Sequence, residues 1–479
     1  AMAARYSDIS ERIWDLKYRH RQDDSPVDTT PEDTWQRVAT ALAAAEPKDR
    51  ADWQHRFFDV MADQRFLPGG RIIAGAGTEK RVTLFNCFVM GRIEDTMDGI
   101  FHALKEAAIT LQQGGGIGHD FSTLRPAGSH TRSAAGEATG PVSFMRIWDS
   151  TCATLLASRS RRGAMMATLR CDHPDIETFV TAKAEPGELR HFNLSVQVTD
   201  AFMQAVANDE DWPLVFPRGV GEGHGETVHR HWPGHTGPVP CRVWRRLPAR
   251  RLWKQIMQSS FDHAEPGVLF VDTINRDNNL WYTEHISATN PCGEIPLPPY
   301  GACDLGSINL ARFVLDPFSP RAHLDLDGIR DTARVATRML DNVIDVSRFP
   351  LPAQEERARA TRRTGLGITG LADALMMLGL DYGHQAARQQ AAAVMETICH
   401  TAYRTSIQLA REKGPFPEFD RDHHLQGRFI QALPTDIRQG IAEWGIRNSH
   451  LLAIAPTGSI SLLAGNVSGG VEPVFSPRH

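Results

Sequence analysis

Three side chains that could do chemistry together lie in the short segment "NPCGE". Asn290, Cys292 and Glu294 occupy alternate positions of this segment, which contains a proline and a glycine. In an extended chain alternate side chains point to the same side, so we expect an amide, a thiol and a carboxylate to converge. A buried carboxylate beside a thiol is costly unless it has partners or a chemical task. The alternative is an ordinary turn with a buried cysteine, since cysteine is among the most buried residue types.

Two further cysteines have strand-like or turn surroundings. Cys87 lies in "VTLFNCFVM" and Cys303 in "YGACDLGS". Cysteines serve mainly in metal ligation, nucleophilic attack and redox chemistry. The C-x-x-C spacing of many metal sites is absent, and Glu294 is a poor base for a papain-type nucleophile. Redox chemistry fits best, with one reacting cysteine and two others that supply electrons by forming a disulfide.

The segment "LLAIAPTGSISLLAG" has the pattern of an anion site. An apolar strand is expected to end at Pro456, and Thr457, Gly458 and Ser459 precede helix formers. Backbone N–H groups and hydroxyls at a helix N-terminus bind anions. No cationic side chain is near in the sequence, so we expect backbone dipoles to hold a phosphate. A capped helix without a ligand is the alternative. The glycine run in "LQQGGGIG" permits close approach to a ligand but is not a P-loop.

The elements that must position these residues alternate between strand and helix. Residues 7–65 are expected to be helical, with Trp14, Leu16, Trp35, Val38 and Leu42 on the apolar side. The run 82–90 is expected to be a buried strand, and "AMMATLRC", "FNLSVQV" and "GVLFVDTI" each precede a helical pattern. Asp172 or His173 is the expected N-cap of the helix in "DHPDIETFVTAK". This order predicts an α/β fold with parallel strands.

Composition excludes several classes of protein. The 479 residues include seven cysteines, 41% are hydrophobic, and the net charge is −5. No global basic surface attracts nucleic acid. The charged N-terminus is unlike a signal peptide, and no apolar run has the length of a membrane span, so no membrane partner is expected. A cytoplasmic protein with reduced thiols is expected.

Taken together, these segments resemble the ribonucleotide reductases, and specifically their adenosylcobalamin-dependent (class II) type. The resemblance is carried by "LFNCFVM", "QQGGGIG", "NPCGEIPLPPYGACDLGSINL", "RNSHLLAIAPTGSISLLAG" and "GVEPVF", in this order. It extends from about Tyr6 to Phe475. Each motif alone is modest, whereas all of them in order, with the three cysteines in place, are very specific.

The resemblance implies a ten-stranded α/β barrel made of two antiparallel halves, each of five parallel strands, around a central finger loop. We expect a helical region at residues 1–66 and the catalytic barrel at 67–479, with the C-terminal part of the barrel missing. A flexible insertion is expected at residues 218–240, which are rich in Gly, Pro and His.

The resemblance also implies roles for the reactive residues. Cys292 would become a thiyl radical that removes the 3′-hydrogen of a ribose, with Glu294 as general base and Asn290 bonded to the sugar. Cys87 and Cys303 would form the disulfide as the 2′-hydroxyl leaves as water. A loop buried in a barrel would protect such a radical from water.

The binding residues follow by the same resemblance. The expected substrate contacts are Asn86, Gly116, Pro456, Thr457, Gly458, Ser459, Ile460 and Ser461. The expected contacts to an allosteric nucleotide are Asp95, Arg125, Arg132, Lys183 and Arg190, and the segment 183–190 would relay effector identity to substrate choice. The implied partners are a ribonucleoside diphosphate, a deoxynucleoside triphosphate or ATP effector, a thioredoxin-like reductant and a second copy of the chain.

Two alternatives stay open. One is the iron-dependent (class I) large subunit, which needs a radical-carrying partner and a tyrosine pair; no Tyr-Tyr occurs in this sequence. The other is a nucleotide-binding fragment without turnover, although such a protein has no need of all five reactive residues.

No metal site is expected. The D-x-H-x-x-G pattern of Asp422, His424 and Gly427 resembles cobalamin-binding domains but lacks their surroundings. The histidines of 218–240 with Cys241 are too irregularly spaced for zinc.

Overall fold

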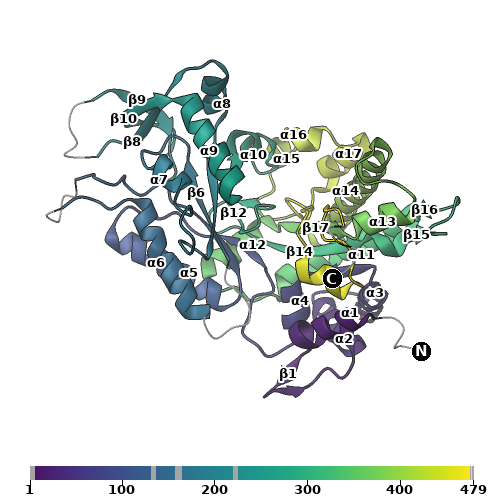
Figure 1. The fold of residues 1–479 in the computed structure, drawn as a ribbon. Coiled ribbons are helices and arrows are strands. Elements are labelled where there is room, and N and C mark those ends of the chain that lie inside the picture. The colour runs from purple at the N-terminus through teal and green to yellow at the C-terminus, as the bar shows by residue number, and fades with distance from the viewer. Residues whose placement is uncertain (1–5, 131–135, 157–163, 220–224, 475, 477–479) are drawn as a thin grey trace. The chain divides into compact units, whose positions relative to one another are not determined.

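The computed structural model describes residues 6–130, 136–156, 164–219, 225–474 and 476 (Figure 1). The chain divides into two compact units. One unit combines residues 1–86 with 302–479, and the other is the continuous stretch from Cys87 to Gly301. In the following, the first is called the discontinuous unit and the second the continuous unit.

The continuous unit is built on five parallel strands. In spatial order they are β4 (Cys87–Val89), β5 (Gly116–Asp120), β6 (Met165–Arg170), β7 (Phe192–Val198) and β11 (Gly267–Phe270). Nearly every residue of β6 and β7 is buried. Such continuous apolar runs are typical of parallel strands that are covered on both faces. The expected parallel α/β architecture is therefore confirmed in this unit.

Helices connect and cover these strands. They are α5 (Met97–Gln112), α6 (Pro141–Leu156), α7 (Ile176–Val180), α8 (Asp200–Ala207), α9 (Ala249–His263) and α10 (Val271–Asp277). Helices α5 and α6 contact each other (Figure 1). The N-cap of α7 is Asp175, so the prediction of Asp172 or His173 was wrong. Asp172 instead pairs with Arg170, and His173 is buried with its Nδ1 accepting the backbone N–H of Asp175.

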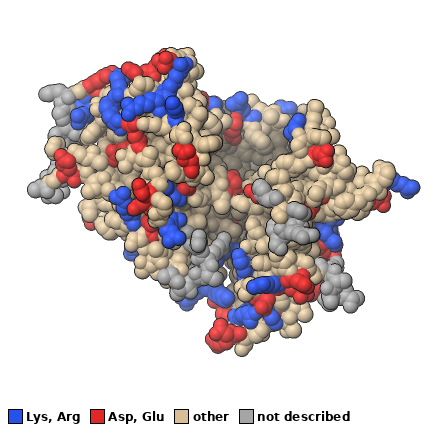
Figure 2. All heavy atoms as spheres, viewed as in Figure 1, with Lys and Arg blue, Asp and Glu red and all other residues tan. Residues whose placement is uncertain are grey.

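A three-stranded antiparallel sheet is also part of the continuous unit. It consists of β8 (Asp211–Pro217), β9 (Thr227–His231) and β10 (Pro238–Pro248), with β10 in the centre. Its buried cluster includes Phe216, Trp232 and Cys241. The range 218–240 thus contains β9 and the start of β10. Basic and acidic side chains are intermixed over this region (Figure 2), as in the pairs Arg245–Glu177 and Arg246–Glu226.

The discontinuous unit begins with helices. They are α1 (Asp8–Ile13), the π-helical turn η1 (Trp14–Tyr18), α2 (Pro31–Ala43), α3 (Arg50–Ala62) and α4 (Gly70–Gly75), with a small β1 (Arg21–Gln22) and β2 (Ser25–Pro26) pair. Trp35 is fully buried, and its indole N–H donates to the hydroxyl of Tyr6 at 3.0 Å. Leu16, which was predicted to face the apolar side, is 68% exposed because η1 interrupts the α-helical period.

The sheet of this unit centres on β14. Strand β14 (Ala302–Asn309) pairs in parallel with β17 (Thr364–Thr369) and antiparallel with β3 (Phe66–Pro68). A parallel bridge joins Leu366 to Leu452. The expected strand before Pro456 is reduced to this bridge. The strand expected over 82–90 is reduced to β4 and an isolated bridge of Thr83 to Arg348.

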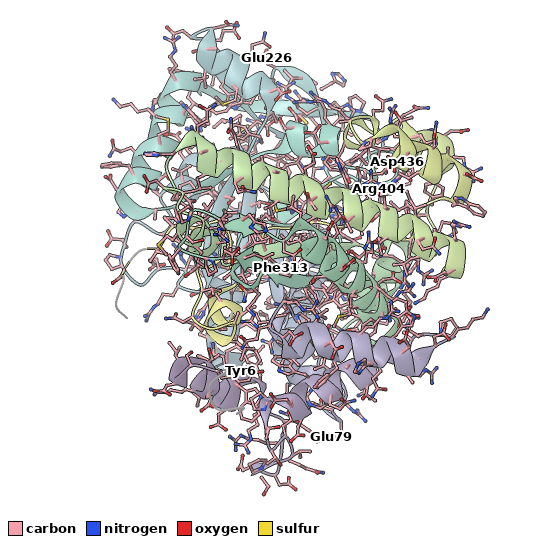
Figure 3. All side chains as sticks on the ribbon, turned by 90° about the vertical axis from the view of Figure 1, so that its right-hand side faces the viewer. Tyr6, Glu79, Glu226, Phe313, Arg404 and Asp436 are labelled. Carbon is pink, nitrogen blue, oxygen red and sulfur yellow. The ribbon has the colours of Figure 1, made fainter. Side chains whose placement is uncertain are left out.

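Further helices belong to this unit, and the first two of them contact its sheet. They are α11 (Leu326–Val346), α12 (Pro352–Thr361), α13 (Leu371–Met377), α14 (Gln385–Lys413), α15 (Arg421–Leu425), α16 (Arg428–Gln431), α17 (Thr435–Trp444) and α18 (Gly458–Leu463). Short elements η2 (Leu310–Phe313), β15 (Val314–Leu315) and β16 (His323–Leu324) follow β14. An ion pair between Arg404 and Asp436 joins α14 to α17 (Figure 3). Across the described residues, no helix combines the length and hydropathy needed to cross a bilayer.

Candidate active site

Cys292 lies at the tip of a small hairpin in the continuous unit. Strands β12 (Ala288–Thr289) and β13 (Pro296–Leu297) pair antiparallel and hold the loop between them. The N–H of Gly293 donates to the carbonyl of Asn290 at 3.0 Å, and Gly293 has a φ of +82°. The segment is therefore a tight turn, and the prediction of an extended segment with three side chains on one side was wrong. Glycine is favoured here because it adopts positive φ without strain.

The turn separates the environments of the three residues. Asn290 is 1% exposed, Cys292 is exposed, and Glu294 is half-buried. All seven cysteines lie in the described part of the chain, and Cys292 is the one that is exposed. The thiol that the resemblance assigns as the reacting one is thus exposed, so the expected burial of its loop is not seen among the described residues. The alternative of a buried cysteine in an ordinary turn does not hold either.

Asn290 connects the hairpin to the sheet. Its side-chain oxygen accepts the backbone N–H of Ile295 at 2.9 Å, which closes the turn. Its side-chain nitrogen donates to the sulfur of Cys87 on β4 at 3.4 Å. One amide therefore orders the loop and contacts a second predicted catalytic residue. Cys87 is buried and pairs in register with Gly116 of β5, so two of the predicted residues adjoin on neighbouring strands.

Glu294 has a carboxyl group suited to accept a proton. Burial raises its pKa above the ordinary value, and a hydrogen bond from Asn290 opposes this rise. Among the described residues its Oε2 has no hydrogen-bond partner. A desolvated carboxylate with one open oxygen is a stronger base than an exposed one, because its ionised form is less stabilised.

The hairpin lies close against the sheet. A Cβ atom on Gly118 of β5 would lie 1.8 Å from the carbonyl oxygen of Thr289, so only glycine allows this approach. From β6, the hydroxyl of Thr168 donates to the carbonyl of Ser287 at 2.8 Å. These two contacts hold the base of the hairpin, at Ser287 and Thr289, against the sheet.

Other predicted residues belong to the discontinuous unit. Cys303 lies on β14, is 1% exposed, and its thiol donates to the carbonyl of Asp304 at 3.4 Å. A Cβ atom on Gly365 would lie 3.2 Å from this sulfur, so the neighbouring strand leaves room for it. Asn86 is half-buried and its amide lies near Gly69.

The predicted anion segment forms the start of α18. Pro456 and Gly458 are exposed, Thr457 and Ile460 are buried, and Thr457 has a φ of +54°. The Thr457 hydroxyl lies 3.0 Å from that of Thr369 and accepts the N–H of Gly470 at 2.9 Å. The Ser461 hydroxyl donates to the carbonyl of Gly458 at 3.1 Å.

A cation stands beside this segment, contrary to the sequence prediction. The ammonium group of Lys17 donates to the hydroxyl of Ser459 at 2.8 Å. The two residues are 442 positions apart, so sequence proximity gave no sign of the contact. Ser10 of α1 also donates to the carbonyl of Leu462 at 2.7 Å, which brings the N-terminal helices onto α18.

The predicted effector residues are only partly brought together. Asp95 and Arg125 form an ion pair with 2.9 Å between Oδ2 and Nε. Lys183 pairs with Glu265 at 2.6 Å and donates to the carbonyl of Phe192, while Arg190 is exposed. Arg132 lies outside the described residues. Within the described ranges, no hydrogen bond or ion pair joins Asp95 or Arg125 to Lys183 or Arg190.

The D-x-H-x-x-G histidine is not available as a ligand. His424 is fully buried, with its ring centroid 5.5 Å from that of Phe416 and 5.3 Å from that of Phe419. Burial lowers its pKa to about 4. In the part of the chain that the structure describes, no group of three or more His, Cys, Asp or Glu residues could hold a metal ion.

The chain belongs to the ribonucleotide reductase family. The family described as ribonucleotide reductase, barrel domain, matches residues 85–479. The family described as ribonucleotide reductase, all-alpha domain, matches residues 4–81. These matches include the hairpin of Cys292, both cysteine-bearing strands and the N-terminal helices.

Particular relatives carry more specific names. A protein of Mycobacterium tuberculosis named vitamin B12-dependent ribonucleoside-diphosphate reductase is 42% identical over 95% of this chain and 60% of its own length. One of Thermoplasma acidophilum with the same name is 35% identical over 98% of the chain and 55% of its own length. The ribonucleoside-diphosphate reductase subunit alpha of Chlamydia muridarum is 27% identical over 97% of the chain. The chain thus spans about 60% of the M. tuberculosis relative.

Proposed function

We propose that this chain carries the catalytic centre of an adenosylcobalamin-dependent ribonucleoside-diphosphate reductase, which makes 2′-deoxyribonucleotides for DNA synthesis. The observation that carries the proposal is the hairpin itself. An exposed Cys292 stands between Asn290 and the desolvated Glu294, and Asn290 is bonded to Cys87. The names of the M. tuberculosis and T. acidophilum relatives support it.

Each of the reactive residues of the chain then has its own step in the proposed reaction. Cys292, as a sulfur-centred radical, takes the 3′-hydrogen atom of the ribose and returns it to the same carbon after the 2′-position has been reduced, when the 3′-hydroxyl also regains its proton. Glu294 accepts the proton of the 3′-hydroxyl, for which its raised pKa suits it. Asn290 holds the sugar while its other contacts keep the loop in place. Cys87 and Cys303 supply two electrons and two protons, so that the 2′-hydroxyl leaves as water and the pair becomes a disulfide.

Adenosylcobalamin, when bound, supplies radical chemistry. The exposed thiol of Cys292 fits this cofactor, since it can be reached from outside the hairpin. His424 does not fit as a cobalt ligand, because phenylalanine rings enclose it. Any contact to the cofactor therefore involves residues other than the D-x-H-x-x-G set.

Substrate phosphates are assigned to Pro456–Ser461, with Asn86 and Gly116 near the nucleoside. The Lys17 ammonium beside Ser459 supports this assignment, since it adds a positive charge to hydroxyl and backbone donors. Among the described residues no carboxylate forms an ion pair with Lys17, so its charge is open to a ligand.

We assign a deoxynucleoside triphosphate or ATP effector to Asp95, Arg125, Arg132, Lys183 and Arg190. The ion pairs of Arg125 and Lys183 would have to open or rearrange for both to contact one nucleotide. A homodimer is part of the proposal. It is supported by exposed apolar side chains on the contacting helices α5 and α6, namely Met97, Phe101 and Leu155.

A ten-stranded barrel with a central finger loop is proposed as the complete fold. Its support is the row of five parallel strands in the continuous unit, with the Cys292 hairpin lying against them. A thioredoxin-like reductant and a cytoplasmic location follow from the proposed role in DNA precursor supply.

The iron-dependent alternative is less favoured, since two relatives named as vitamin B12-dependent are 42% and 35% identical to the chain. The alternative of a binding protein without turnover is disfavoured by the intact reactive residues.

The test is anaerobic reduction of CDP with adenosylcobalamin and dithiothreitol, with Cys292→Ala in parallel. We expect dCDP from the wild-type chain and none from the variant. Nucleotide binding without product in the wild type would contradict the proposal and favour the binding protein. Product that requires a partner protein and ignores cobalamin would favour the iron-dependent class.

A further inference from the structure

One side chain from β7 forms a hydrogen bond with the peptide unit between Pro291 and Cys292. Asn193 is the second residue of β7, and its side-chain nitrogen donates to the carbonyl oxygen of Pro291 at 2.7 Å. Asn193 and Pro291 are 98 positions apart in the sequence. The contact lies wholly within the continuous unit, and none of the roles assigned above includes Asn193.

This carbonyl controls the placement of the reactive residue. The peptide unit is planar, so the Pro291 oxygen, the Cys292 nitrogen and the Cys292 Cα move together. The proline ring fixes its own φ, which leaves ψ of Pro291 as the soft torsion on this side. The bond from Asn193 restrains that torsion. On the other side Gly293 is conformationally permissive, with its φ of +82°.

Packing restrains the side chain of Cys292 less than that of its neighbour Asn290. Its side chain is exposed, whereas Asn290 two positions earlier is 1% exposed. Hydrogen-atom transfer requires the reacting atoms at close range, and a misplacement of about 1 Å can reduce a rate about 100-fold.

We propose that Asn193 is a positioning residue that sets the location of the Cys292 sulfur through the Pro291 carbonyl. The proposal rests on the proposed function for its kinetic consequences, but the restraint itself exists whether or not the chain reduces nucleotides. Asn193 touches no reacting atom in this scheme.

The structure offers a matched control. Thr168 of β6 donates to the carbonyl of Ser287 at 2.8 Å, a bond of similar length from a neighbouring strand to the same hairpin. That carbonyl lies before the hairpin strand β12 rather than beside Cys292. A general loosening of the hairpin would affect Thr168→Val and Asn193 variants alike.

The kinetic experiment compares the wild-type chain with Asn193→Ala, Asn193→Asp and Thr168→Val. Asn193→Asp keeps the side-chain shape but removes the N–H donor. With CDP and 3′-deuterated CDP, we expect kcat of both Asn193 variants to fall about 10- to 100-fold with KM nearly unchanged. The deuterium isotope effect on kcat should rise, because hydrogen abstraction becomes slower, and Thr168→Val should keep the wild-type isotope effect. A rise in KM at unchanged kcat, or wild-type kcat in both Asn193 variants, would overturn the proposal.

A second measurement does not depend on turnover. Iodoacetamide alkylation of Cys292 is followed by peptide mass spectrometry in the absence of nucleotide and cofactor. We expect the alkylation rate of Cys292 in Asn193→Ala to differ about five-fold from that in the wild-type chain, which corresponds to the loss of one hydrogen bond. In Thr168→Val we expect the alkylation rate of Cys292 to equal the wild-type rate. Equal rates in the wild-type chain and Asn193→Ala would overturn the proposal. A wild-type chain without turnover would contradict the proposed function, while the alkylation rates would still decide the role of Asn193.

Discussion

The loop of Cys292 and the segment from Pro456 to Ser461 are held by different kinds of contact. The loop is held by an amide, a thiol and backbone carbonyls, as in the bond from Asn290 to Cys87. The segment is held by hydroxyl groups and by the ammonium group of Lys17. In the loop the charged group next to Cys292 is the half-buried Glu294, whereas the charged group beside the segment is the exposed Lys17.

This difference separates two tasks. Uncharged, directional bonds fix position, which matters for a hydrogen-atom transfer that depends on distance. An exposed cation contributes attraction to phosphate, which acts over a longer range and is screened by salt. Changes in the loop should therefore alter kcat, and changes beside the segment should alter KM.

The largest effect is expected from Glu294→Gln. The amide cannot accept the 3′-hydroxyl proton, so kcat for CDP should fall about 100- to 10,000-fold at nearly constant KM. Steady-state dCDP formation measures this. Glu356→Gln, at an exposed position of α12, should match the wild-type chain. A kcat within ten-fold of the wild-type value would show that Glu294 is not the base.

A smaller effect, on binding alone, is expected from Lys17→Met. KM for CDP should rise about 3- to 10-fold with kcat unchanged, since an exposed ionic contact contributes about 1 kcal/mol. Raising the salt concentration should reduce the difference between variant and wild type. Lys48→Met is the control, because Lys48 is also exposed. An unchanged KM would contradict the view that the segment beside Lys17 acts in substrate binding.

Asn290→Ala should sharpen the comparison through pH. Burial raises the pKa of Glu294, and the bond from Asn290 lowers it, so loss of the amide should raise that pKa further. The base acts when ionised, so activity is lost as pH falls through this pKa. In a plot of kcat against pH, the loss of activity at low pH should therefore begin at a higher pH in the variant than in the wild-type chain. A loss that begins at the same pH as in the wild-type chain would mean that Glu294 does not govern it.

The smallest effect on activity, but a clear one on stability, is expected from Asp304→Asn. Asp304 on β14 is fully buried, and neither carboxylate oxygen has a hydrogen-bond partner among the described residues. Burial raises its pKa well above the ordinary value, and nearby Asp341 adds to the rise.

The native state therefore holds a proton that the unfolded chain loses above the ordinary aspartate pKa. Stability that depends on this proton is complete below that ordinary value and declines as pH rises toward the folded-state pKa. The variant should have a higher Tm than the wild type at neutral pH, and the gain should shrink toward pH 4. Thermal unfolding across this range measures it, with Asp381→Asn at an exposed site as control. A gain that does not vary with pH would contradict the assignment.

Sequence patterns predicted what depends on neighbouring residues. Strand β7 coincides with "FNLSVQV" because a run of apolar residues between turn signals is a local property. The turn at Gly293 was missed, since alternate spacing was taken to mean an extended chain and the positive φ of one glycine reverses that conclusion. Lys17 was missed because the fold, and not the sequence, brings it to Ser459.

The two units also differ in whether their residues are continuous in the sequence. Residues 87–301 follow one another without interruption, whereas the other unit is completed only by residues 302–479. During synthesis all strands of the continuous unit are made before the discontinuous unit can be completed, because the contact of Lys17 with Ser459 requires that residue 459 has been synthesised. We expect the hairpin of Cys292 to fold early, against a sheet that has already formed. The N-terminal helices can pack against α18 only later. For this chain the order of assembly on the ribosome is thus not the order of the sequence.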